Sequence, residues 1–468
     1  MIFQTTRDML SDKIFLKKTF TIALPVAMQG MLNTVVNLVD TLMIGTLGDT
    51  TIAAVGLANK VFFVFNLLIF GIMSGTTILA AQYYGNGDMK NVKRLLGLGL
   101  VLSLIGTMFF AIPSIFVPQL VMRIFTVNPD TIQMGASYLW IVAIGYPFSA
   151  VTNIYVALLR ATQKVKLPVF TSCVAIAVNV FFNALFIFEP SQLTIFGMTI
   201  DIFGFGMGAP GAAIATLIAR MVETVLIVSV IQIRKYPIAC KFAEMMSFSK
   251  NLVQQFIHTA TPVVLNEFMW GLGVTLYSLA YGRMGDQAVA AITIATTIQD
   301  ISVVFFQGVS SATAVILGSV MGAGRLDTAE TYAKYFFRLQ FMGTLVCMAL
   351  CYCLIGPILS LYNISELVAH DTRLCILVFI LYMPVKMFNY INIVGVLRSG
   401  GDTKMCLFLD TSGVWLIGVP LAFLGGLVWK LPIYVVYALV FLEEIYKMIF
   451  GYMRYRQKKW LRNLATEI

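Results

Sequence analysis

Long apolar runs, separated by short polar segments, occupy almost the whole chain. A helix needs about 20 apolar residues to cross the hydrocarbon core of a bilayer, and twelve runs reach that length. They lie at roughly 19–45, 52–82, 93–117, 135–158, 166–188, 209–232, 257–282, 290–319, 333–356, 372–396, 404–427 and 430–453. Strands of a membrane β-barrel are excluded, because such strands are shorter and alternate between apolar and polar residues. The pattern predicts an all-α integral membrane protein with twelve transmembrane helices.

The composition supports this class. Hydrophobic residues make up 59% of the 468 residues and charged residues only 12%, whereas soluble chains are about 45–50% apolar and about 25% charged. A water-soluble globule and a disordered chain are both excluded, since neither accommodates so many apolar and aromatic side chains.

The basic residues indicate the orientation. Most of the 32 Lys and Arg residues fall in alternate loops and in the two terminal segments. Because cytoplasmic loops carry an excess of Lys and Arg, both termini are predicted to be cytoplasmic, in the plasma or inner membrane. The net charge of +10 therefore marks orientation, and no nucleic-acid partner is expected.

One segment departs from the helical pattern. Between the fifth and sixth runs, apolar and polar residues alternate at Leu193–Phe196 and Ile200–Phe203, on either side of Gly197. Such alternation around a turn residue is typical of a β-hairpin. We expect a short hairpin near 193–203, over the external mouth.

The chain also repeats itself. A shift of 237 residues aligns its two halves, and Pro25 then falls on Pro262 and Gly85 on Gly322. Six helices in each half place the repeats parallel to one another, and such repeats form two lobes around a central cavity with alternating access. The predicted divisions are an N-terminal lobe at 1–232, a cytoplasmic linker at 233–255 and a C-terminal lobe at 256–468.

Polar side chains within the first and fifth predicted helices form the first candidate site. A polar stripe on an apolar helix must face protein or water, and the spacing of four residues in the first helix puts them on one face. They are Gln29, Asn33, Asn37 and Asp40 in the first helix and Asn179 and Asn183 in the fifth. The stripe is interpreted as a cavity wall with Asp40 as its ionisable group, and the alternative is a satisfied packing stripe between helices.

A second group lies in the C-terminal half. Glu267 and Trp270, followed by Tyr277, have near-helical spacing, and Asp300 lies within the eighth helix. A carboxylate beside aromatic surface suits a lipophilic cation, although an interfacial aromatic belt explains the same spacing. Carboxyl groups in a low-dielectric cavity hold protons more tightly than in water, so Asp40 and Glu267 can exchange a proton or bind Na⁺. The sequence does not distinguish between H⁺ and Na⁺ as the ion that binds.

We expect the other charged residues in the predicted spans to have structural roles. Asp410 and the Glu443–Glu444 pair are expected to pair with Lys386 or Lys404, and Arg220 with Glu223 on one helix. Two histidines and seven cysteines show no metal-ligand spacing. No cofactor and no certain metal site are expected.

Several motifs together resemble the multidrug and toxic compound extrusion (MATE) family, in its prokaryotic DinF-like branch. They are the run Leu38–Gly45, the segment Gln82–Gly87, Asn179 through Asn183, Gly211 through Thr216, and the Leu-Arg turns at Arg160 and Arg398. The resemblance implies a fold of two pseudo-symmetric six-helix lobes and cation-coupled antiport, with H⁺ or Na⁺ entering while organic cations leave. It also implies that Asp40 is the coupling acid. Asn183 stands where such members often have Asp, which favours H⁺.

The expected partners are small lipophilic or cationic molecules and the lipid bilayer, and the expected state is a monomer. A flippase for a lipid-linked sugar is the alternative transporter, although acidic candidates and twelve spans argue against it. An intramembrane enzyme is a further alternative, but the sequence offers no convergent His, Ser or metal set for one.

Overall fold

The protein is described by a computed structural model. The model describes residues 2–45, 47–189, 191–195, 198–202, 204–360, 362 and 364–466. Within these ranges, the side chains of residues 2–4, 37–39, 42, 49, 191–195 and 198–202 are also outside the description. Contacts divide the chain into unit 1, which holds Met1–Ala27, Thr77–Asp88 and Lys250–Ile468, and unit 2, which holds Met28–Thr76 and Met89–Ser249. The division into lobes at 1–232 and 256–468 stays a prediction.

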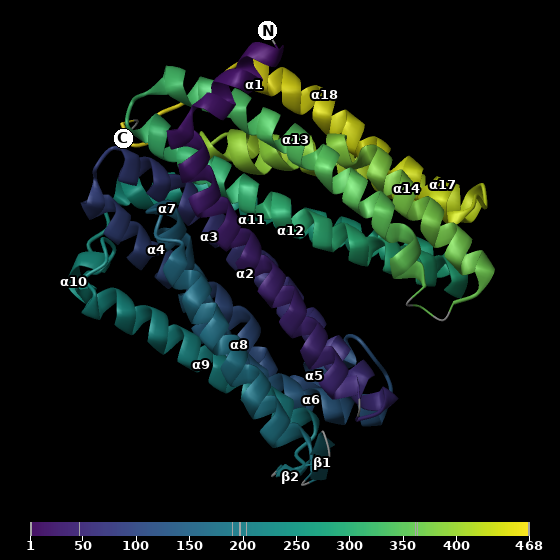
Figure 1. The fold of residues 1–468 in the computed structure, drawn as a ribbon. Helices are drawn as coiled ribbons and strands as arrows, with labels where there is room; N and C mark the ends of the chain where they lie inside the picture. The colour runs from purple at the N-terminus through teal and green to yellow at the C-terminus, as the bar shows by residue number, and fades with distance from the viewer. Residues whose placement is uncertain are drawn as a thin grey trace. The chain divides into compact units, whose positions relative to one another are not determined.

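Unit 2 is a bundle of helices around one apolar core. Its elements are most of α2 (Lys13–Gly45) and α3 (Asp49–Gly85), with α4 (Met89–Phe116), α5 (Pro118–Arg123), α6 (Pro129–Ile144), α7 (Tyr146–Ala161), α8 (Lys166–Ile187), β1 (Ser191–Ile195), β2 (Met198–Ile202), α9 (Ala209–Ile233) and α10 (Phe242–Met245). α8 and α9 run side by side (Figure 1). The core includes Phe65 and Tyr146, whose rings stack with centroids 4.7 Å apart.

Unit 1 contains α1, the start of α2, the end of α3 and the C-terminal half of the chain. Its elements are α1 (Ile2–Ser11), α11 (Lys250–Met284), α12 (Asp286–Gly322), α13 (Leu326–Leu359), α14 (Glu366–Asn389), η1 (Tyr390–Leu397), α15 (Thr403–Ser412), η2 (Gly413–Gly418), α16 (Val419–Phe423), η3 (Leu424–Val428), α17 (Ile433–Val440) and α18 (Leu442–Arg456). α14 packs against α13, α17 and α18 (Figure 1). The three η segments are π-helical, a wider winding that often occurs at functional positions.

Local sequence explains where several helices begin and bend. Asn128 caps α6, because its Oδ1 accepts hydrogen bonds from the backbone of Asp130 at 3.0 Å and Thr131 at 3.4 Å. The predicted helix at 135–158 is divided at Gly145 into α6 and α7, which are bent by 44°. Pro147 follows this break, and a proline cannot donate the backbone hydrogen bond that would continue the helix.

Within the described residues, ten helices are long and apolar enough to cross a membrane, and the bent pair raises the number to eleven. The predicted span at 430–453 forms α17 and α18, with a break at Phe441. Each part is too short to span a membrane by itself, because α17 has 8 residues and α18 has 15. Glu443, Glu444 and Lys447 of α18 are buried in unit 1.

Residues 191–195 and 198–202 form two antiparallel strands, with Ser191 paired to Ile202 and Ile195 to Met198. The predicted hairpin overlaps them. Its Phe196, Gly197 and Phe203 lie outside the described residues.

Candidate functional site: a polar cavity in unit 2 and a charge cluster in unit 1

A cavity of about 280 Å³ lies within unit 2. Five helices supply polar side chains to its wall, and α2 and α9 hold its charged groups. Three of these helices supply Gln29, Asn33 and Asp40 from α2, Ser172 and Asn179 from α8, and Thr216, Arg220 and Glu223 from α9. A second cavity of about 400 Å³ shares Asp40 and Arg220 with the first and adds the aromatic side chains Phe63, Tyr138 and Tyr146. The two cavities therefore meet at these two charged side chains.

Asp40 begins a chain of hydrogen bonds that crosses three helices. Asn183 Nδ2 donates to Asp40 Oδ1 at 2.6 Å and to Asn179 Oδ1 at 3.2 Å. Asn179 Nδ2 in turn donates to Thr216 Oγ1 at 3.4 Å. Both asparagines are almost fully buried, so the chain fixes the carboxylate of Asp40 against α8.

A second polar chain starts at Arg160, at the end of α7. Arg160 Nη2 donates to Gln29 Oε1 at 2.6 Å, and Gln29 Nε2 donates to Ser172 Oγ at 3.0 Å. Ser172 Oγ then donates to Glu223 Oε1 at 2.9 Å, while Glu223 Oε2 pairs with Arg220 Nη1 at 3.3 Å. Each carboxylate oxygen of Glu223 thus has a donor, as a buried charge requires.

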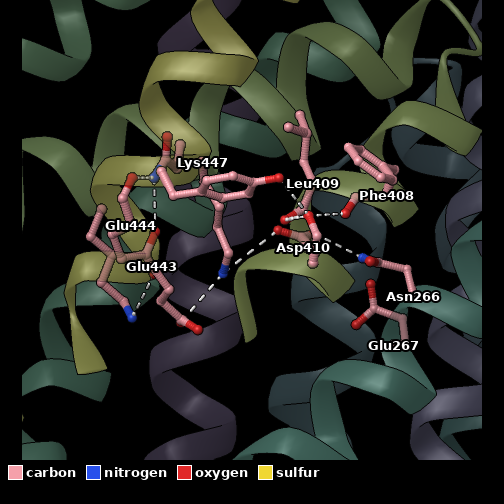
Figure 2. Close-up of polar contacts among 12 residues, drawn as sticks. Asn266, Glu267, Phe408, Leu409, Asp410, Glu443, Glu444 and Lys447 are labelled. Carbon is pink, nitrogen blue, oxygen red and sulfur yellow. Dashed lines mark hydrogen bonds and ion pairs between the residues drawn. The ribbon is translucent and has the colours of Figure 1, made fainter. Parts of the chain in front are cut away.

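Unit 1 holds a buried charge cluster built on α11, α15 and α18 (Figure 2). Arg398, which lies between η1 and α15 in the chain, also belongs to it. Arg398 Nη2 lies 3.0 Å from Glu267 Oε1, and the side chains are 3% and 13% exposed. Asn266 Nδ2 donates to Asp410 Oδ2 at 2.9 Å. Lys447 lies between Asp410, at 3.9 Å, and Glu443, at 3.3 Å.

The cluster continues along α14 and α18. Tyr277 donates its hydroxyl proton to Glu443 Oε2 at 2.6 Å. Glu444 Oε2 accepts a hydrogen bond from Asn389 Nδ2 at 2.8 Å, and Glu444 Oε1 accepts one from Lys386 Nζ at 3.5 Å. Four carboxylates and three cations thus lie close together, with side chains no more than 24% exposed, and their Coulomb interactions are stronger than between fully exposed groups.

A similar arginine contact occurs within each of the two units. Arg160 binds Gln29 in unit 2 and Arg398 binds Glu267 in unit 1, and both pairs are separated by 131 residues in the chain. The same turn therefore returns an arginine to the same helix in each half, to an amide four residues after Pro25 and to a carboxylate five residues after Pro262.

A family model described as MatE matches residues 25–185 and 262–424. The chain belongs to the MatE family. The matched segments begin at the two prolines, Pro25 and Pro262, that the internal alignment superimposes.

Curated relatives of this MatE protein match over most of their length. The uncharacterized transporter YisQ of Bacillus subtilis is 22% identical, over 97% of this chain and 96% of the relative. The probable multidrug resistance protein YoeA of the same bacterium is 24% identical, over 93% and 92%. The multidrug resistance protein MdtK of Yersinia enterocolitica is 22% identical, over 88% of each chain.

Solved structures show the same fold. A multidrug resistance MATE family transporter of the MOP superfamily, in an outward-facing conformation, superposes with a TM-score of 0.84 at 19% identity, over 95% of each chain. A MATE structure in a bent conformation gives a TM-score of 0.85 at 18% identity, over 95% of each chain. The predicted MATE fold is confirmed.

The predicted polar stripe of this MatE protein is brought to one cavity. Gln29, Asn33, Asp40 and Asn179 line it, and Asn183 reaches it through Asp40. The side chain of Asn37 lies outside the described residues. The sequence interpretation missed Arg160, Ser172 and Thr216, although the repetition of the Leu-Arg turn at Arg398 was a signal for the first.

The structure does not bring the predicted substrate residues of the C-terminal half together. Glu267 and Tyr277 belong to the buried cluster, whereas Trp270 is 42% exposed and Asp300 is also exposed. Arg220 pairs with Glu223 and Lys386 with Glu444, as expected.

For Asp410 and Glu443 the structure supplies another partner, Lys447, which lies within the predicted span at 430–453. Within the described residues, no group of three or more His, Cys, Asp or Glu side chains could hold a metal ion.

Proposed function

We propose that this MatE protein is a cation-coupled antiporter that exports small organic molecules by alternating access, with Asp40 as the coupling acid. The observation that carries the proposal is the 2.6 Å hydrogen bond from Asn183 to Asp40 at the wall of a polar cavity. A carboxyl group at such a wall exchanges protons or cations with the cavity and is also joined to a neighbouring helix. The family membership and the curated multidrug relatives support export as the activity.

The proposed coupling step uses the amide of Asn183. With Asp40 ionised, Asn183 Nδ2 is its donor. A protonated Asp40 becomes a donor itself, and Asn183 Oδ1 is a buried acceptor without a partner in the described structure. Protonation therefore exchanges one α2–α8 hydrogen bond for another with a rotated amide, and it removes a charge from the cavity. A change of this kind shifts the balance between two conformations by the difference in its free energy between them.

We favour H⁺ as the coupling ion. Asp40 supplies one carboxylate, and the two neighbours Asn179 and Asn183 supply only neutral amides. A Na⁺ ion at these three residues is the alternative, because amide and carboxylate oxygens are also the ligands that hard cations prefer. Glu267, Trp270, Tyr277 and Asp300 stay a predicted substrate surface, as do the monomeric state and the cytoplasmic termini in the inner membrane.

The test is efflux of a fluorescent organic cation from proteoliposomes, with a pH gradient and a Na⁺ gradient imposed separately. We expect the pH gradient to drive efflux by the unaltered protein, and Asp40→Asn to reduce this efflux by about a hundredfold or more, the lower end of what a positioned proton-transfer group contributes. Asp130→Asn, an exposed carboxylate in the first turn of α6, is the matched control and should transport normally. Full gradient-driven efflux by Asp40→Asn would refute the coupling role, and efflux driven only by Na⁺ would assign the other ion.

A further inference from the structure

A groove of about 620 Å³ opens on the surface of unit 2 and shares no lining residue with the two polar cavities. It lies between the end of α4, the short helix α5 and the first turns of α6, which pack against one another (Figure 1). The predicted spans at 93–117 and 135–158 flank this segment, and the predicted orientation places it outside. The groove therefore belongs to the outer boundary of the membrane and not to the proposed transport site.

A contact between a methionine and a glycine holds α5 in place. Met122 is fully buried, and a Cβ at Gly135 of α6 would overlap its methyl group. The glycine thus admits Met122 and brings α5 against α6. Gln119 and Arg123 lie one helical turn apart on α5, and both line the groove.

α6 supplies the facing wall. Gln133, Ser137 and Trp140 follow one another at spacings of four and three residues, which puts them on one face of the helix. The hydroxyl proton of Ser137 is donated to the carbonyl oxygen of Met134 at 2.7 Å. The amide of Gln133 and the indole N–H of Trp140 have no hydrogen-bond partner among the described residues, so these two groups can donate to a ligand.

Arg123 gives the groove a positive charge. Its side chain is exposed and has neither an ion pair nor a hydrogen bond among the described residues. All ten residues that line the groove are described, and none of them is acidic. A guanidinium has five N–H donors in a planar fork that matches a phosphate. Because no lining residue compensates this charge, the groove favours an anion.

The same groove has an apolar side. Phe116 and Leu120 line it and are 77% and 61% exposed. Apolar side chains with this exposure are unfavourable in water and gain from contact with acyl chains. Trp140 is also partly exposed, and tryptophan is typical of the boundary between membrane and water. A soluble anion would use Arg123 alone, whereas a phospholipid would also cover the apolar side.

We propose that this groove binds an anionic phospholipid of the surrounding bilayer. The lipid phosphate pairs with Arg123, and the amides of Gln119 and Gln133 donate to the headgroup. An acyl chain lies along Phe116 and Leu120. The groove volume falls within the range of ligand pockets, about 300–1,000 Å³. The inference does not depend on the proposed function, since it uses neither Asp40 nor the polar cavities.

The test is native mass spectrometry of the purified, delipidated full-length protein in detergent. The two probes are phosphatidylglycerol and phosphatidylcholine with identical acyl chains, which differ in net headgroup charge. We expect the first phosphatidylglycerol to bind about fivefold more tightly or better, the effect of one basic side chain on an anionic lipid. Arg123→Gln should remove this preference, and Arg123→Lys should keep part of it. Arg373→Gln, at an exposed arginine of α14 in unit 1, is the matched control and should keep all of it.

A second variant and a competitor identify the two parts of the groove. Phe116→Ala should weaken both lipids to a similar extent and keep the preference, because it removes an apolar contact that both lipids make. Excess inorganic phosphate should not displace phosphatidylglycerol. Arg123 and Phe116 are both exposed, so the variants should unfold at the temperature of the unaltered protein.

Three results would overturn the inference. They are equal binding of the two lipids by the unaltered protein, a preference that persists in Arg123→Gln, and displacement of phosphatidylglycerol by inorganic phosphate. The last of these would assign the groove to a free anion. None of them would alter the efflux expected of the unaltered protein or of Asp40→Asn, so this inference and the proposed function fail separately.

Discussion

Single residues in this protein act through partners that are distant in the chain. Arg398 is 2% exposed and joins η1 to α11 through Glu267. Its Nε and Nη1 are buried without partners in the described structure, so the ion pair with Glu267 is a large part of what compensates the buried charge. Removing one member of a buried pair strands the other, which costs about 3–5 kcal/mol.

The first residue-scale prediction follows from this pair. Glu267→Gln should destabilise the protein by several degrees in thermal unfolding, because Arg398 then lacks its counter-charge. Glu267→Leu/Arg398→Met, which removes both charges, should recover much of that loss. The measurement is the melting temperature in detergent, and a double variant less stable than Glu267→Gln would show that the pair is not the cause. Glu366→Gln, an exposed acidic residue in the first turn of α14, serves as control.

At the scale of elements, the ends of α3 and α12 meet within unit 1 through two glycines. A Cβ at Gly85 would overlap the backbone oxygen of Ser319, and one at Gly322 would overlap the backbone oxygen of Gln82. These glycines correspond under the shift of 237 residues, so each repeat supplies the small residue that admits the backbone of the other. Close backbone contact of this kind is typical of helix packing in membranes.

We therefore predict that Gly85→Ala or Gly322→Ala separates the two helix ends. The backbone cannot rotate away as a side chain can. Each substitution should therefore lower the free energy of unfolding by at least about 1–3 kcal/mol, the usual effect of overpacking a core. Gly356→Ala in α13 has open space around the new methyl group and should be nearly neutral. Disulfide cross-linking between two cysteines, one introduced at the end of α3 and one at the end of α12, measures how closely the ends approach. If Gly85→Ala cross-links as efficiently as the protein with both glycines, the prediction is wrong.

At the scale of the molecule, the last residues of the chain connect several helices of unit 1. The side chain of Gln82 donates to the backbone of Ser399 at 2.8 Å and accepts from the backbone of Leu464 at 2.6 Å. Asn463 Nδ2 donates to Gly322 at 3.2 Å, and Gln255 Nε2 donates to Leu464 at 2.7 Å. The segment 460–464 thus connects the ends of α3 and α12 to the start of α11 and the turn after η1.

Trp460 anchors this segment and allows its contribution to be measured. Its side chain is fully buried and stacks on Tyr455 with centroids 5.8 Å apart. Trp460→Ala should cost about 3–5 kcal/mol, the usual value for a buried aromatic residue. Trp429→Ala, at a side chain that is 51% exposed, should cost less than about 1 kcal/mol. Thermal unfolding and protease resistance of unit 1 distinguish the two, and equal effects would show that the C-terminal segment is not an anchor.

The sequence by itself determined the class of the protein, most of its spans and the polar face of α2. These features depend on hydropathy and on helical spacing between neighbours in the chain, which are local quantities. The same reasoning grouped Asn179 with Asn183, because they lie one turn apart on an apolar helix, whereas the hydrogen bond from Asn183 to Asp40 joins two helices. The predicted span at 430–453 is divided at Phe441 into α17 and α18, and the apolar pattern did not predict this break.

Only the tertiary structure decided the partners of the charged side chains. Arg160 and Arg398 follow the predicted spans at 135–158 and 372–396, and Lys447 lies near the end of the span at 430–453. A positive charge at such a position is usually exposed to water. Folding instead returns each arginine to a helix 131 residues away and places Lys447 between Asp410 and Glu443. A pattern along the chain records which residues share a helix face. Which distant face lies opposite is decided by packing, and that packing makes Arg220 a cavity residue as well as a partner of Glu223.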